Sequence, residues 1–121
     1  MKNNILIKHP RNWGLQSRLV EELAKRALKE AGFEEGVELS LIFVGRKKAR
    51  DLNMKYRQKD YIPQVLGFPM SVERDADGWT RLGDVVICTQ KLKYEAVYQN
   101  KSQEMILFEW LKHGVENLKK G

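Results

Sequence analysis

The sequence is poor in the residues that make disulfides, metal sites and membrane spans. It has one cysteine, two histidines and three prolines among 121 residues. The single cysteine, Cys88, cannot form an internal disulfide, and its place after the apolar run 85–87 indicates a buried core thiol rather than a nucleophile. The apolar runs 39–44 and 106–111 are too short to cross a bilayer, and residues 1–4 lack the long apolar stretch of a signal peptide. We therefore expect a cytoplasmic protein without a membrane partner.

The remaining composition is typical of one compact domain with a basic surplus. With 42% hydrophobic and 31% charged residues, the chain fits a single domain that spans residues 1–121. The net charge of +6 and the pI near 9.5 would attract a polyanion at long range. Such a charge fits either a nucleic-acid partner or an ordinary solvated basic face. The basic residues gather in one segment, at Arg46, Lys47, Lys48, Arg50, Lys55, Arg57 and Lys59.

Apolar periodicity predicts strands and helices that alternate without a linker. The predicted strands cover 5–7, 37–44, 65–69 and 82–88, and the predicted helices cover 15–31, 46–57 and two segments after Thr89 and Ser102, which can cap them. The segment 37–44 is apolar on both faces, as in a central strand covered on both sides. This order predicts an α+β fold, in which a mixed sheet of about four strands is packed by helices.

The helix predicted at 46–57 places its charges on one face. Ala49, Leu52 and Tyr56 share the other face, while Asn53 falls with the basic residues. We expect Tyr56, together with Phe68 in the next strand, to lie in the core rather than to stack on bases.

Ordered sequence blocks are the most specific signal in the chain. They read Leu52-Asn53-x-x-Tyr56-Arg57-x-Lys59-Asp60, Val65-Leu66-Gly67-Phe68-Pro69, Leu82-Gly83-Asp84-Val85-Val86-Ile87 and Leu111-Lys112-His113-Gly114. They resemble the YbeY family of bacterial rRNA-maturation endoribonucleases, whose pattern is roughly L-N-x-x-Y-R-x-K-D-x-x-T-D-V-L-S-F-P, then L-G-D-I-V-I-S, then H-G-x-L-H-L-x-G-Y-D-H. The resemblance spans nearly the whole chain.

This resemblance implies a zinc ion held by the three histidines of the last motif and hydrolysis of single-stranded RNA during trimming of small-subunit ribosomal RNA. Histidines at i and i+4 of a helix face one metal, a third closes the site, and a bound water has its pKa lowered toward about 7. On this chain the first ligand position is His113. The second is Asn117, whose amide oxygen is a weak zinc ligand. The third position falls just beyond Gly121.

The histidines also have structural alternatives. His113 would be a polar residue in the final turns of a helix, where its cationic form favours the C-terminal end. His9, beside Pro10, is interpreted as a core or surface residue rather than a substitute ligand. Glu116 could reach a metal shared with His113 only if the helix end rearranged.

The resemblance assigns RNA handling to Arg57, which matches the family's arginine and whose guanidinium suits a bidentate grip on a phosphate. Its structural alternative is an ion pair with Asp60 or Asp84. We take His113 and Arg57 as candidate catalytic residues. The predicted RNA-binding surface consists of Arg57, Lys59, Arg46, Lys47, Lys48 and Arg50.

Several positions depart from the family pattern. Its Thr-Asp before Val-Leu is Pro63-Gln64 here, and its serine before Phe-Pro is Gly67. The acidic residues usual at the start of the basic helix are replaced by Gly-Arg-Lys-Lys at 45–48, which raises the positive charge near the expected RNA groove. Gly83 and Asp84 are expected to serve the turn into the last strand.

Two hypotheses from different classes follow. In the first, the chain is a metal-dependent endoribonuclease that uses His113, with the metal completed by water, Asn117 or a partner chain. In the second, it is a metal-free relative that keeps the basic groove and holds ribosomal RNA or a ribosomal protein without cutting RNA. The number of zinc ligands separates the two.

Overall fold

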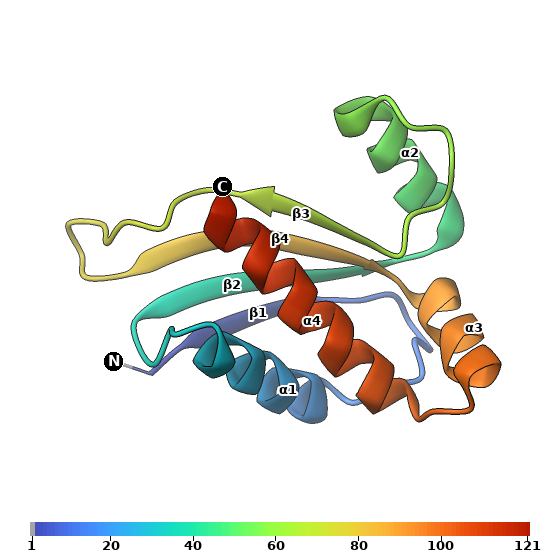
Figure 1. The fold of residues 1–121 in the computed structure, drawn as a ribbon, viewed down its shortest axis with the longest axis horizontal. Helices are drawn as coiled ribbons and strands as arrows, with labels where there is room; N and C mark the ends of the chain where they lie inside the picture. The colour runs from blue at the N-terminus through green and yellow to red at the C-terminus, as the bar shows by residue number, and fades with distance from the viewer. Residues whose placement is uncertain (1) are drawn as a thin grey trace.

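The computed structural model describes residues 2–121 and confirms the predicted α+β class. The strands and helices follow one another along the chain as Figure 1 shows. Strand β4 begins two residues before its predicted start, because Thr80 and Arg81 pair with Val37 and Glu38. In chain order the elements are β1 (Asn4–Lys8), α1 (Ser17–Glu30), β2 (Val37–Val44), α2 (Arg46–Arg57), β3 (Val65–Pro69), β4 (Thr80–Cys88), α3 (Thr89–Gln99) and α4 (Gln103–Lys120).

The strands of the described residues form one four-stranded sheet in the order β1-β2-β4-β3. β1, β2 and β4 run parallel and β3 is antiparallel to β4, so the sheet is mixed as predicted. Helices α1 and α4 lie across one face (Figure 1). β2 is a central strand, but its residues alternate between buried and half-buried. Its second face is therefore only partly covered, where full cover was predicted.

The core lies between the sheet and helices α1 and α4. Leu39 and Leu41 of β2 are fully buried in it. Gly114 allows α4 to approach β4 closely, because a Cβ at this position would lie only 3.0 Å from Val85 Cγ1. Cys88 is buried at the end of β4, which confirms its interpretation as a core thiol.

The two predicted helix caps have different outcomes. Ser102 caps α4 as predicted, since its hydroxyl accepts a hydrogen bond from the Met105 backbone N–H at 3.2 Å. The prediction for Thr89 was wrong, because α3 begins at Thr89 itself and its N-cap residue is Cys88. The Thr89 hydroxyl instead donates to the Val44 carbonyl at 3.1 Å, which ties the start of α3 to the end of β2.

Gly83 lies inside β4 and not in the turn before it, so that prediction was also wrong. Its φ of +138° lies in a region that favours glycine, and a Cβ there would lie 2.3 Å from the Phe68 carbonyl oxygen. The register between β2 and β4 shifts next to it, between Glu38 and Leu39. Gly83 therefore permits a β-bulge and the close approach of β3.

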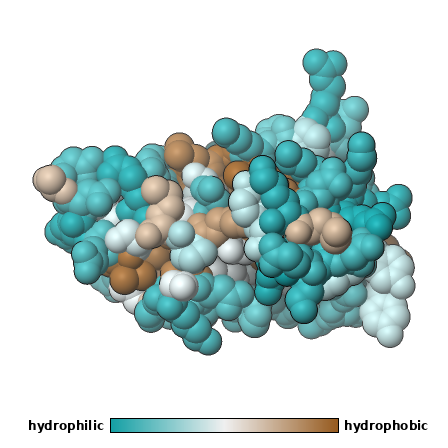
Figure 2. Space-filling model, turned by 90° about the horizontal axis from the view of Figure 1, so that it is seen from above, coloured by the Kyte–Doolittle hydropathy of each residue, from teal (hydrophilic) through white to brown (hydrophobic). Residues whose placement is uncertain are grey.

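The surface seen from above is mainly hydrophilic, and apolar side chains gather there in small patches (Figure 2). Within residues 2–121, no helix has both the length and the apolar character that crossing a membrane requires.

Candidate functional site

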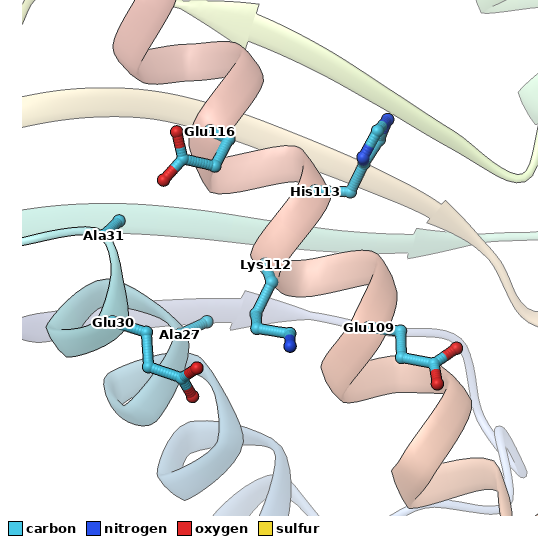
Figure 3. Close-up of a pocket in the computed structure, with 7 residues that line it drawn as sticks. All are labelled: Ala27, Glu30, Ala31, Glu109, Lys112, His113 and Glu116. Carbon is cyan, nitrogen blue, oxygen red and sulfur yellow. The ribbon is translucent and has the colours of Figure 1, made fainter.

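His113 lies exposed on α4 between two hollows. The first has a volume of about 420 Å³ and separates α4 from α1, with Glu30, Glu109, Lys112 and Glu116 among its lining residues. Figure 3 shows the His113 ring pointing away from Glu30 and Glu116. This hollow is rich in carboxylates, so it is a poor environment for a polyanion.

The second hollow beside His113 has a volume of about 310 Å³. It is lined by residues 61–65, Trp110 and His113. Gln64, which stands where the family pattern has an aspartate, is therefore next to the candidate catalytic histidine. The Gln64 backbone carbonyl accepts a hydrogen bond from the Cys88 N–H at 3.0 Å, which fixes the start of β3 against the end of β4.

Asn117 is exposed one helical turn after His113, so the two side chains share a face of α4. Gly67 of β3 lies against this turn, because a Cβ at Gly67 would be 3.9 Å from the Asn117 Cβ. Of the departures from the family pattern, Gln64 lines the same hollow as His113, and Gly67 and Asn117 contact each other one turn further along α4. No single sequence block contains this arrangement, since β3 and α4 lie far apart in the chain.

These residues do not by themselves fit a zinc site. Structural and catalytic zinc sites use at least three protein ligands, chiefly imidazole, thiolate and carboxylate. Here the positions that match the motif offer one imidazole, from His113, and one amide, from Asn117. Residues 2–121 contain no cluster of three or more His, Cys, Asp or Glu side chains that could hold a metal ion. The third motif position lies outside the sequence.

The other histidine, His9, has local partners. Its ring stacks on Trp13 with the centroids 4.0 Å apart and the planes at 7°, and its Nδ1 lies 2.9 Å from the Pro10 carbonyl oxygen. The side chain is exposed. This confirms the interpretation of His9 as a surface histidine.

The predicted RNA-binding residues Arg46, Lys47, Lys48, Arg50, Arg57 and Lys59 are all exposed, on α2 or just after it. Arg50 is paired, since its guanidinium contacts Asp60 Oδ1 at 2.6 Å and 2.7 Å. Arg57 forms no ion pair with any residue of the described range. The structural alternative for Arg57 was therefore wrong, because Arg50 occupies Asp60, and the Arg57 guanidinium is free to meet an anion.

The position of Asn53 on α2 was predicted wrongly. It is fully buried, with 0% exposure, although the helical pattern placed it on the basic face. Its Nδ2 donates to the Tyr61 carbonyl at 3.1 Å, and its backbone carbonyl accepts from the Lys59 N–H at 3.3 Å. Asn53 thereby holds the loop that leads to the second hollow beside His113. Its spacing of four residues from buried Ala49 is the sequence signal that could have identified it.

Tyr56 was predicted in the core but is 54% exposed, because the residues that α2 buries are Ala49 and Asn53 instead. Phe68 is half-buried and meets the Tyr56 ring edge-on, with centroids 5.2 Å apart. The two rings form one wall of a groove of about 340 Å³ on the sheet face away from α4. Asp84 also lines this groove. Neither the groove nor this position of Asp84 was predicted from the sequence.

Comparison with known proteins agrees with the sequence blocks. The family described as Endoribonuclease YbeY matches residues 8–118. Proteins named Endoribonuclease YbeY are 34% identical over 90 residues in Janthinobacterium sp. (74% of this chain and 58% of that protein) and 38% identical over 81 residues in Pseudomonas putida (67% and 52%). One from Acinetobacter baumannii is 30% identical over 108 residues (86% and 68%).

The fold has a solved counterpart as well. The solution structure of the Thermotoga maritima protein TM1509 superposes with a TM-score of 0.60 at 23% identity, over 96% of this chain and 71% of that one. The chain spans about half to two thirds of the length of the curated relatives it matches. On the match over residues 8–118, the chain belongs to the YbeY endoribonuclease family.

Proposed function

We propose that this chain acts as an endoribonuclease on single-stranded RNA during maturation of small-subunit ribosomal RNA, in the cytoplasm where ribosomes assemble. Family membership supports the reaction class. The observation that carries the proposal is the position of His113, which matches the first ligand of the family motif and is exposed beside a hollow of about 310 Å³.

The basic side chains have a role in binding the substrate. Arg57 carries an unpaired guanidinium within the described residues, which suits a phosphate of the RNA backbone. Lys59 and the exposed cations of α2 add charge for further phosphates. The Lys59 N–H donates to the backbone carbonyl of Asn53 at 3.3 Å, which keeps the backbone of Lys59 against the end of α2.

We propose zinc as the cofactor of this reaction. His113 would be its protein ligand, and Asn117 would be a second, weak ligand. A bound zinc ion would supply a water of lowered pKa as the nucleophile. The chain's own donors fall short of three protein ligands, so we assign no hydrolytic step to a metal held by these residues alone.

A second candidate function is favoured by Asn117. An amide in place of the second imidazole weakens metal binding whatever group fills the third position. In this alternative the chain holds ribosomal RNA, or a ribosomal protein, through its basic surface and does not cut RNA.

The deciding experiment measures metal content and RNA cleavage on the same purified protein. Zinc is quantified by mass spectrometry, and cleavage is followed with a fluorescently labelled single-stranded RNA. The variants are His113→Ala and, as the matched histidine control, His9→Ala. Stoichiometric zinc and cleavage that both disappear only in His113→Ala support the enzyme. Metal-free protein that binds the RNA without cutting it overturns the enzyme in favour of the binding module.

A further inference from the structure

The groove on the open sheet face has no role in either proposed function. It lies between α2 and strands β2, β3 and β4, with a volume of about 340 Å³, which is within the range of small-ligand pockets. Its floor is apolar and consists of Ile42, Val44 and Val86, with Leu52 from α2 beside them. The two hollows beside His113 lie against α4, which packs on the opposite face of the sheet.

One wall of this groove is aromatic. The rings of Tyr56 and Phe68 meet edge-on, with an interplanar angle of 74° and a centroid distance of 5.2 Å. Tyr56 is more than half exposed, so its ring is not buried in the core and can contact a ligand. Aromatic faces of this kind bind unpaired nucleobases by stacking, because every base has an apolar π-face.

Asp84 gives the groove chemical selectivity. It stands opposite Phe68 in the β3–β4 register, is half-buried, and forms no ion pair or hydrogen bond with residues 2–121 through its side chain. An ionised carboxylate accepts hydrogen bonds and donates none, and a partly buried one is stabilised when donors reach it. Among the common bases, only guanine presents two adjacent donors on its Watson–Crick edge, N1–H and the 2-amino group. These two donors match the two carboxylate oxygens.

The cations around the groove favour an anionic ligand such as RNA over a neutral or cationic one. Lys48 lines the groove, and Lys55 lies over the Tyr56 ring at 5.2 Å from its centroid. Arg57 follows on the same helix without an ion pair among the described residues. By contrast, the hollow between α1 and α4 is lined by Glu30, Glu109 and Glu116. Phosphates that flank a base in the groove would therefore meet cations.

We propose that this groove binds one unpaired guanine of single-stranded RNA, with the base against Tyr56 and Phe68, its Watson–Crick edge on Asp84 and a flanking phosphate near Lys48. This inference rests on the proposed action of the chain on RNA and adds sequence preference to it. The guanine is held away from His113, so the groove selects a position in the RNA and takes no part in cleavage.

The test compares two five-nucleotide RNAs that differ by one amino group. Fluorescence anisotropy measures the affinity of the intact chain for CCGCC and for CCICC, in which inosine lacks the 2-amino group of guanine. The guanine RNA is expected to bind roughly tenfold more tightly, because one good base contact discriminates by a factor of this order. Asp84→Asn should abolish the preference.

Tyr56→Leu should weaken binding of both RNAs by about tenfold, which is the effect of losing one stacking face. The matched control is Tyr94→Leu, because Tyr94 is also an exposed tyrosine on a helix, at 63%, and does not line the groove. It should leave both affinities unchanged. Thermal unfolding of each variant checks that the fold is retained. If Asp84→Asn does not fold, Tyr56→Leu still tests the groove.

The outcomes separate this inference from the function on which it rests. A guanine preference that disappears in Asp84→Asn supports the guanine site. RNA binding that shows no such preference, or that Tyr56→Leu leaves unchanged, overturns the guanine site while the action on RNA stands, and it leaves the groove to a protein partner. Failure of the chain to bind either RNA overturns both proposals.

Discussion

Gly67 of β3 lies directly against Asn117 of α4: a Cβ at Gly67 would be 3.9 Å from the Asn117 Cβ and 3.5 Å from Leu118 Cδ2. Each position departs from the family pattern, glycine for serine and asparagine for histidine. Their contact means that both changes alter the same small region beside His113. Gly67 has no side chain and Asn117 offers only an amide, so this region presents a cation with fewer and weaker ligands.

The first prediction is that Asn117→His increases zinc affinity. The new imidazole would stand four residues from His113 on the same helical face, where two nitrogens can meet one metal. The gain should exceed about tenfold, since losing even an outer-shell partner of a metal ligand costs 10- to 100-fold. Competition with a chromophoric zinc chelator measures it. Val97→His is the control, because Val97 is 82% exposed on α3 and has no acidic residue three or four positions away. An equal gain there would contradict the prediction.

The second prediction concerns Gly83. Gly83→Ala should destabilise the fold by at least about 1–3 kcal/mol, because φ is +138° and an alanine there strains the backbone. The contact of the new Cβ with the Phe68 carbonyl oxygen adds to this cost. Urea unfolding at fixed pH measures the change. Gly67→Ala is the control on the neighbouring strand, where the nearest atom to a Cβ is 3.5 Å away and no positive φ is involved. It should change stability by less than about 1 kcal/mol. Equal effects of the two substitutions would refute the strain argument.

The third prediction is that Asn53→Ala lowers stability by roughly 0.5–1.5 kcal/mol, because it removes the hydrogen bond from Asn53 Nδ2 to the Tyr61 carbonyl. The loss is limited because Asn53 Oδ1 is buried without a hydrogen-bond partner among the described residues, so its removal strands no donor. The variant should also make the loop at 58–61 more accessible to limited proteolysis, since Asn53 holds this loop. The exposed amide of Asn117 provides the control. Asn117→Ala should leave both unfolding and proteolysis nearly unchanged, and an Asn53→Ala protein as stable as this control would show that the loop has other anchors.

The fourth prediction concerns acid stability. The Arg81 guanidinium bonds Asp77 Oδ2 at 2.9 Å and, together with the Trp79 backbone N–H, holds the pKa of Asp77 below its ordinary value of 3.8. A carboxyl group whose pKa is lower in the folded state stabilises the fold above its unfolded pKa, and this contribution is lost as the pH falls through the folded value.

Asp77→Asn should therefore reduce the loss of stability on going from about pH 6 to about pH 3, where the wild-type contribution titrates away. Urea midpoints at both values provide the measurement. Asp51→Asn is the control, since Asp51 is exposed on α2 and forms no ion pair within residues 2–121. If the two variants respond identically to acid, the pair with Arg81 has no part in the pH dependence.

The fifth prediction separates two exposed arginines of α2. Arg57→Ala should reduce the salt dependence of RNA binding by about 0.7 in the slope of log affinity against log salt, as expected when one phosphate contact to a single strand is lost. Arg50→Ala should reduce it less, because Asp60 already pairs with Arg50 at 2.6 Å. Titrations at several salt concentrations give both slopes. A larger change in slope for Arg50→Ala than for Arg57→Ala would contradict the prediction and assign the phosphate contact to Arg50.

The sequence by itself determined the elements and their order. Apolar periodicity and Gly and Pro signals act over a few residues, so the strands at 37–44 and 65–69 and the helix at 46–57 were predicted with the bounds that the structure has. The Ser102 cap is equally local. The ordered blocks identified the family, because they depend on spacing along the chain and not on contacts across it.

Only the tertiary structure decided which side chains face one another. Asn53 is buried because the loop after α2 folds back over it, and Arg57 is free because Arg50 reaches Asp60 first. Gly83 lies within β4 because β3 returns close to it. These outcomes depend on contacts between segments, of α2 with the loop that follows it and of β3 with β4. The periodicity of one segment carries no information about which other segment will cover it.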